Sequence, residues 1–179
     1  FWTDIETTGL DAQRDKILEI AVFEADLSDP FNAKMVYHRV LQHPPVTTGY
    51  HPDVIVMHEK TGLWDEAAKS LTTFEAVEHD LLTIVPEVED YSDRPVVAGS
   101  SAHFDLGFIK KWMPKLAKRL SHRVFDVSTL KMLAISLGME KLIKTEAHRA
   151  IEDVEESILH GKMAVDWIRG IKTQPVISE

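Results

Sequence analysis

The 179-residue sequence contains no cysteine. Disulfide bonds, thiolate zinc sites and a cysteine nucleophile are therefore excluded, and the composition fits a reducing compartment such as the cytoplasm. No apolar run approaches the roughly 20 residues that a membrane-spanning helix needs, and no secretory signal peptide is recognisable. The sequence therefore predicts a cytoplasmic protein with no membrane partner.

Basic residues are also scarce, since 20 lysines and arginines stand against 29 acids and give a net charge of −9. A chain this acidic is not expected to bind nucleic acid through its bulk charge. Residues 106–125 are an exception, because they contain no acid and carry a cluster of bases. Two interpretations stay open, a solvated helix face and a patch that faces phosphate. The bases of this window are Lys110, Lys111, Lys115, Lys118, Arg119 and Arg123.

The length and a hydrophobic content of 44% suffice for one α/β domain with its own core. We expect this domain over residues 1–172 and a C-terminal tail over residues 173–179. Five strands are predicted from short, mostly apolar runs. They cover residues 1–6, 16–25, 33–41, 94–99 and 124–127.

Helices are predicted where apolar residues recur at a spacing of three and four. They cover residues 61–68, 72–85, 104–113, 128–137 and 151–168, with a short helix after Pro114. Prolines and a glycine assign residues 43–52 to a loop. Three early strands followed by alternating strands and helices predict a mixed sheet flanked by helices.

Several acids lie at the boundaries of these elements. Asp4 and Glu6 end the first strand, one residue apart, so their side chains point to the same side. Asp105 lies near the start of a helix, and Asp153 follows His148 by five residues at the start of the closing helix. Ligand sites of open α/β sheets gather at strand ends, so we expect these groups to meet. Four carboxylates suit two Mg²⁺ or Mn²⁺ ions, and a histidine suits a general base near neutral pH.

Each of these residues also has a purely structural interpretation. Asp4 and Glu6 can mark a solvated strand end, and His148 and Asp105 can cap helices. The whole order, Asp-x-Glu, Asp and His-x-x-x-x-Asp, is much more specific than any one member. It favours a two-metal phosphodiesterase site.

Three segments resemble the exonuclease motifs of the DEDDh group, which has a ribonuclease H-like fold. They are DIETTGL, the segment around Asp105, and HRAIED. Within this group the sequence is most similar to the oligoribonuclease family, through ETTGLDAQRDKILEIA, FIKKWMPKL and RVFDVSTLK. The resemblance covers nearly the whole chain. It implies a ribonuclease H-like mixed five-stranded sheet and a homodimeric 3′→5′ exoribonuclease that degrades short oligoribonucleotides, especially dinucleotides, to mononucleotides.

The resemblance also implies individual roles. It makes Asp4, Glu6, Asp105 and Asp153 the ligands of two divalent ions, and His148 the base. The residues that it implies for substrate binding are Leu10, His58, Ser101, His122, Arg123, Ser128 and Thr129.

Within the substrate set, Leu10 matches a wedge that separates the two terminal bases, and His122 matches a residue that stacks on a base. Ser101 belongs to a cap on the 5′ phosphate. The other three members of this cap are Arg123, Ser128 and Thr129. In the family they come from the second subunit of a homodimer.

The sequence departs from the family at three aromatic positions. His122 stands where the family usually has tyrosine, and it can still stack on a base. Asp53 aligns with a base-stacking tryptophan, for which Tyr50 or His51 is the candidate substitute, and Val124 replaces another aromatic. Glu19 lies in the apolar strand ILEIAVF, where a buried acid needs a partner. We interpret this acid as support for the site and not as a metal ligand.

Two rival functions remain. A 3′→5′ DNA exonuclease of the proofreading or repair type would use the same chemistry on longer substrates. A catalytically silent interaction domain would keep only the fold. The segment RVFDVSTLK favours the exoribonuclease over the first rival, and the intact set of catalytic positions argues against the second.

Overall fold

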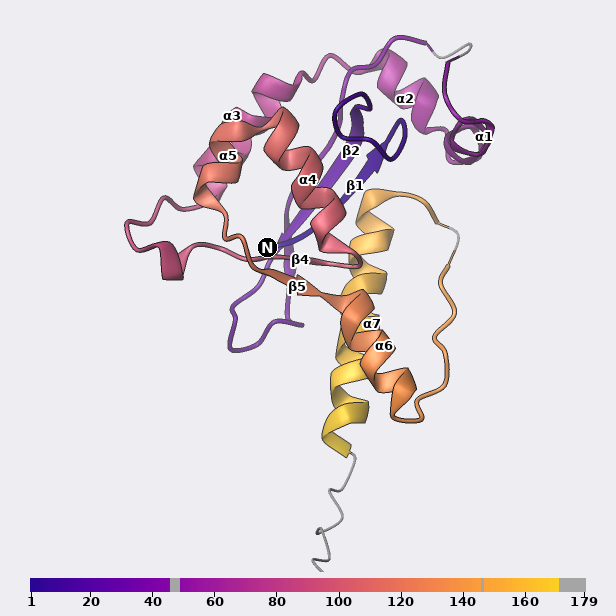
Figure 1. The fold of residues 1–179 in the computed structure, drawn as a ribbon. Coiled ribbons are helices and arrows are strands. Elements are labelled where there is room, and N and C mark those ends of the chain that lie inside the picture. The colour runs from indigo at the N-terminus through magenta and orange to yellow at the C-terminus, as the bar shows by residue number, and fades with distance from the viewer. Residues whose placement is uncertain (46–48, 146, 171–179) are drawn as a thin grey trace, which may run out of the picture.

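The structure is a computed structural model that describes residues 1–45, 49–145 and 147–170. Its centre is a mixed five-stranded sheet with the strand order β3-β2-β1-β4-β5 (Figure 1). β1 is antiparallel to β2 and parallel to β4; β2 and β3 are antiparallel, and β4 and β5 are parallel. The strands are β1 (Trp2–Thr7), β2 (Ile17–Glu24), β3 (Lys34–Val40), β4 (Val97–Gly99) and β5 (Val124–Asp126). The predicted ribonuclease H-like mixed sheet is confirmed.

Seven α-helices and one 3₁₀ turn connect and cover these strands in the described part of the chain. The helices before β4 are α1 (Pro52–Lys60), α2 (Leu63–Lys69) and α3 (Phe74–Ile84), followed by the turn η1 (Tyr91–Asp93). The later helices are α4 (Ala102–Trp112), α5 (Pro114–Arg119), α6 (Val127–Ser136) and α7 (Ala150–Gly170). None of the helices that the structure describes is long and apolar enough to cross a membrane.

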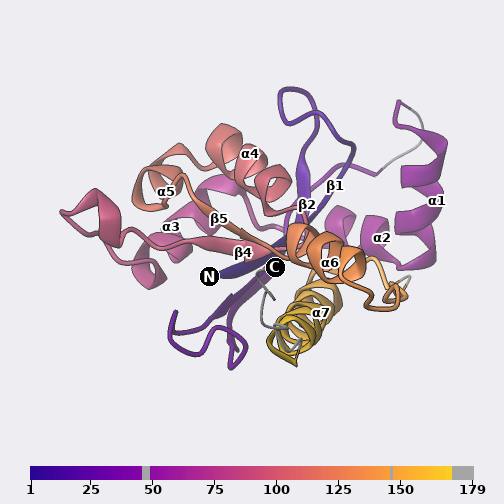
Figure 2. The same ribbon diagram turned by 60° about the horizontal axis from the view of Figure 1, so that its bottom comes forward.

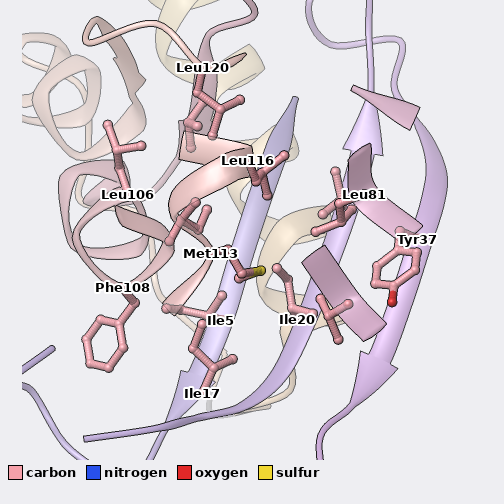
Figure 3. Close-up of a cluster of buried hydrophobic side chains, with 14 of the residues drawn as sticks. Ile5, Ile17, Ile20, Tyr37, Leu81, Leu106, Phe108, Met113, Leu116 and Leu120 are labelled. Carbon is pink, nitrogen blue, oxygen red and sulfur yellow. The ribbon is translucent and has the colours of Figure 1, made fainter. Parts of the chain in front are cut away.

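Helices cover both faces of the sheet, which explains why β2 is buried from Ile17 to Phe23. Ile20 and Val22 belong to the core beneath α3, α4 and α5, whereas Ala21 and Phe23 belong to the core beneath α7. Figure 2 shows α4 and α5 on one side of the strands and α7 on the other. In Figure 3, Ile20 of the sheet lies close to Met113, the residue between α4 and α5. A strand buried on both faces has no polar alternation.

Gly161 lies inside α7, where the sequence pattern shows a gap in the apolar face. A Cβ atom at this position would lie 3.0 Å from Phe31 and 3.2 Å from Val127. The glycine therefore lets α7 approach its neighbours closely. This close packing fixes the long helix that carries Asp153.

The structure corrects the prediction in three places. α1 is an additional helix, although its Val54, Ile55 and Val56 favour strands; Pro52 at its start fits a helix N-terminus. α2 begins at Leu63, and β4 is only three residues long. Of the predicted loop and tail, residues 46–48 and 173–179 lie outside the described residues.

Candidate active site

Three predicted ligands converge at the carboxyl end of β1. One carboxylate oxygen from each of Asp4, Glu6 and Asp153 lies within 4.8 Å of the other two. Strand alternation turns Asp4 and Glu6 to the same side, with the buried Ile5 between them. Asp153 comes from the first turn of α7, which packs against β1. The site thus joins two elements that are far apart in the sequence.

Asp105, the fourth predicted ligand, lies beside this group but outside it. It belongs to the first turn of α4 and is only 3% exposed. Its Oδ1 accepts a hydrogen bond of 3.1 Å from the backbone N–H of Ile5, between the two acids of β1. One oxygen of Asp105 is therefore held against the strand.

The crowding of buried carboxylates changes their protonation. Burial raises the pKa of Asp4 well above its usual range, and the charges of Asp105, Asp153 and Glu6 raise it further. Burial, followed by the charge of Asp153, raises the pKa of Glu6 to about 8. Burial also raises the pKa of Asp105 to about 8. A bound cation would relieve this repulsion.

Asp153 provides the clearest sign that the cluster suits a metal ion. Its Oδ1 is buried and has no hydrogen-bond partner among the described residues. The Nζ atom of Lys144 lies 3.5 Å away, an ion-pair distance that is too long for a good hydrogen bond. An all-oxygen set with an unsatisfied carboxylate fits hard divalent ions such as Mg²⁺ and Mn²⁺.

His148 lies two residues before α7, in the left-handed backbone region with φ of 48°. It is half-buried and lines a hollow of about 280 Å³ with residues of α1 and with Thr61. Burial raises the pKa of Asp153, and Lys144 and then His148 act against this effect. The role of His148 as the base stays a prediction.

His58 lies in α1, not in a loop, and is fully buried. Its Nε2 donates to the carbonyl oxygen of Thr7 at 2.9 Å and lies 3.9 Å from Oε2 of Glu6. Its Nδ1 has no partner among the described residues. In this arrangement His58 supports the end of β1, and a contact with substrate stays a prediction.

A larger cavity of about 720 Å³ lies between α1 and the loop after β1. Leu10 lines it and is 84% exposed, as a wedge between bases would need to be. Tyr50 and His51 also line it, but Tyr50 stacks on Trp64 at 5.7 Å and His51 caps α1. Asp53, at the position of the family's tryptophan, is an exposed lining residue in the first turn of α1.

The residues of the predicted phosphate cap gather near β5 and the start of α6. The hydroxyl oxygens of Ser101 and Ser128 lie 3.2 Å apart within one chain. Thr129 donates its backbone N–H to Oδ1 of Asp126 at 3.0 Å. Arg123 is exposed, and its side chain has no hydrogen-bond partner in the described part of the chain.

Two further observations concern the surroundings of this cap. His122 stacks on Tyr91 with ring centroids 5.5 Å apart. Within the basic window, Arg119 donates to the carbonyl oxygens of Leu82 and Val85, so it holds the end of α3. The window is therefore partly structural.

Lys144, Arg149 and Glu66 also belong to the surroundings of the site, although no sequence pattern indicates them. Lys144 contacts Asp153, and Arg149 joins Glu19 to Glu66. A single charge in a loop or on a helix surface gives no local signal of such contacts. Only the burial of Glu19 predicted a partner, and its pairing with Arg149 confirms that prediction.

The fold and the carboxylate cluster define the class of this protein as a ribonuclease H-like nuclease. The family described as Exonuclease matches residues 1–159. Three relatives of known name are oligoribonucleases.

The oligoribonuclease of Francisella tularensis subsp. novicida is 32% identical over 158 residues, and the match covers 88% of both chains. That of Neisseria meningitidis serogroup C is 33% identical over 160 residues, covering 88% of this chain and 85% of the relative. The mitochondrial oligoribonuclease of Bos taurus is 31% identical over 172 residues, with 88% and 68% covered. The chain belongs to the exonuclease family and, within it, to the oligoribonucleases.

Solved structures support the fold. The zinc-bound complex of Escherichia coli exonuclease I with single-stranded DNA has a TM-score of 0.62 and 15% sequence identity. The match covers 94% of this chain and 40% of that one. At this identity the likeness concerns the fold alone.

The raised carboxyl pKa values predict how metal-free stability depends on pH. Between about pH 4, where unfolded carboxyls titrate, and the pKa of about 8 of Glu6 and Asp105, the folded chain holds more protons than the unfolded chain. The free energy of unfolding therefore falls as pH rises through this window. Melting temperatures in EDTA between pH 5 and pH 8.5 should show this decline, and Glu6→Gln should make it shallower. An equally steep decline in Glu6→Gln would contradict the assignment to Glu6.

Proposed function

We propose that this chain is a 3′→5′ exoribonuclease that hydrolyses short oligoribonucleotides, especially dinucleotides, to nucleoside 5′-monophosphates. The observation that carries the proposal is the convergence of Asp4, Glu6 and Asp153 within 4.8 Å in a chain of the oligoribonuclease family. A single exonuclease domain over residues 1–172 and a cytoplasmic location are parts of the same proposal.

The residues present fit a two-metal hydrolysis. Two Mg²⁺ or Mn²⁺ ions would supply a polarised water and neutralise the leaving oxygen. Asp4, Glu6, Asp105 and Asp153 would hold them. His148 would take a proton from the attacking water as its oxygen bonds to phosphorus. The bond from phosphorus to the 3′ oxygen breaks, and that oxygen gains a proton.

The test is hydrolysis of a 5′-phosphorylated RNA dinucleotide in the presence of Mn²⁺. We expect nucleoside 5′-monophosphates as the only products, resolved by chromatography, and no hydrolysis with EDTA. No hydrolysis with Mn²⁺ would favour the silent interaction domain. Nucleoside 3′-phosphates would show that the bond to the 5′ oxygen breaks, which would contradict the proposed cleavage of the bond from phosphorus to the 3′ oxygen.

A homodimer is the proposed assembly. Exposed apolar side chains gather on the adjacent helices α6 and α7, among them Met132, Leu133, Leu159, Met163 and Trp167. Several large exposed apolar side chains on two packed helices favour a protein partner. A second copy of the chain would also bring its Arg123 and Thr129 to the phosphate cap.

Replacing Arg123 with alanine should reduce kcat/KM for 5′-phosphorylated dinucleotides by about ten- to a hundred-fold. A guanidinium grips a phosphate with two parallel hydrogen bonds, and charge-assisted bonds contribute about 1.5–3 kcal/mol. Longer RNA cannot place its 5′ phosphate in the cap, so it should lose less. Lys118→Ala is the matched control, since Lys118 is another exposed base of the same window. Equal losses on all lengths would contradict the cap.

Mixed dimers test whether the cap acts between subunits. A heterodimer of Arg123→Ala and Asp4→Ala chains has one site with an intact metal centre and an intact cap from its partner. Dinucleotide hydrolysis should then exceed the average of the two homodimers. If subunit exchange is confirmed by mass and no recovery follows, Arg123 acts within its own subunit or not at the phosphate.

A DNA exonuclease of the proofreading or repair type is the second candidate. Asp53 in place of the family's tryptophan leaves the 720 Å³ cavity without that stacking surface. A cavity of this kind favours longer substrates, which gain contacts beyond the terminal bases.

A further inference from the structure

Arg149, the residue after His148, has both edges of its guanidinium filled by carboxylates. Its Nε lies 3.0 Å from Oε2 of Glu19, and its Nη2 lies 2.9 Å from Oε1. On the other edge, Nη1 and Nη2 donate to the two carboxylate oxygens of Glu66 at 3.0 and 2.9 Å. Two bidentate pairs fix both the position and the plane of the guanidinium.

Glu19 also ties down the backbone next to Arg149. Its side chain, in the first half of β2, is 1% exposed. Oε2 accepts the backbone N–H of Ala150 at 3.1 Å, and Oε1 lies 2.7 Å from Nε2 of His38. Residues 149 and 150 are therefore anchored to the sheet through both a side chain and a main-chain amide.

His148 directly precedes this anchor, and its φ of 48° is unfavourable for a residue with a Cβ atom. Such a conformation persists only where the surrounding structure imposes it. The contacts of Arg149 and Ala150 supply that constraint on the C-terminal side of His148. Without them the backbone at His148 would be free to relax from this conformation.

We infer that Arg149, Glu19 and Glu66 form a clamp that positions the imidazole of His148 toward the metal cluster. The inference rests on the proposed function, in which His148 takes the proton from water. Arg149 is a positioning residue, because its side chain contacts carboxylates and not the reacting atoms.

Glu66 distinguishes this role from simple support of the fold. Its side chain is 49% exposed on α2, and exposed ion pairs contribute little to stability. It still completes the second edge of the guanidinium. A change at Glu66 should therefore alter catalysis while the protein stays folded.

The first test is Arg149→Met, which removes the fork but keeps much of the side-chain volume. We expect kcat on a dinucleotide to fall by about ten- to a hundred-fold, since small misplacement of a catalytic group has effects of this size. KM should stay within about threefold, and the Mn²⁺ affinity, measured by electron paramagnetic resonance, should not change. Arg149→Lys should recover part of kcat, because one ammonium can reach one carboxylate. Arg39→Met, an exposed arginine of β3, is the control.

The second test is a double-mutant cycle with Glu66→Gln, which also serves if Arg149→Met fails to fold. Glu66→Gln alone should lower kcat several-fold, but it should have no further effect in the Arg149→Met background, because both changes break the same contact. Wild-type kcat in both single variants, alongside a large loss in His148→Ala, would overturn the clamp and leave the base intact. Wild-type kcat in His148→Ala would instead remove the base, and the clamp with it. Mn²⁺ affinity that falls as much as kcat would show that the clamp acts on the metal ligand Asp153 and not on His148. That result would also overturn the inference.

Discussion

Replacing Asp4 with alanine should abolish hydrolysis at every Mg²⁺ concentration. Asp4 contributes one of three carboxylates that meet within 4.8 Å, so its loss removes a ligand of the proposed ion pair. The Lewis-acid contribution of such ions is several kcal/mol, which corresponds to a loss of about 10³–10⁴-fold in turnover. Initial rates on a dinucleotide, measured against an Mg²⁺ titration, check this expectation.

Two comparisons make the Asp4→Ala result interpretable. Glu24→Ala removes an exposed carboxylate at the far end of β2 and should keep wild-type turnover. Asp4→Ala should stay folded, since an acid whose pKa is raised in the folded chain does not stabilise the fold near neutral pH. Full recovery of Asp4→Ala by excess Mn²⁺ would make Asp4 peripheral to the ions.

Replacing His148 with alanine should reduce turnover by about 10²–10⁴-fold, the usual contribution of general acid–base catalysis. Metal binding should stay nearly intact, because the ligands come from other residues. Parallel measurements of kcat and of Mn²⁺ affinity separate the two effects. His79→Ala, an exposed histidine of α3, should behave as wild type. Wild-type turnover in His148→Ala would remove histidine from the mechanism.

Most of the sheet and of the cluster of carboxylates can be predicted from the sequence, for physical reasons. Asp4 and Glu6 share a face because side chains alternate along a strand. Asp153 is placed by the apolar period of the closing helix. These signals are local, so they survive without knowledge of the fold.

Other features depend on contacts between distant residues and could not be predicted. The pairing of Arg149 with Glu19 spans 130 positions, and Lys144 meets Asp153 only because a loop returns over α7. The proximity of Ser101 and Ser128 within one chain is likewise a tertiary contact. The role of Ser128 in the phosphate cap of the second subunit stays a prediction.

Two residues that line the cavity of Leu10 bear on the choice between short RNA and longer DNA as the substrate. Leu10 is exposed there, as the wedge between two bases requires, while Asp53 replaces the stacking tryptophan. The proposed phosphate cap would favour a substrate that ends within the site. A long DNA strand would gain nothing from such a cap.

The most direct test is therefore a length series with Mn²⁺, comparing kcat/KM for 5′-phosphorylated RNA and DNA from two to about ten nucleotides. The account predicts the highest value for the RNA dinucleotide, a steep fall with each added nucleotide, and lower values for DNA of every length. A value that rises with length, or DNA cleaved as well as RNA, would contradict it and favour the proofreading or repair type of exonuclease.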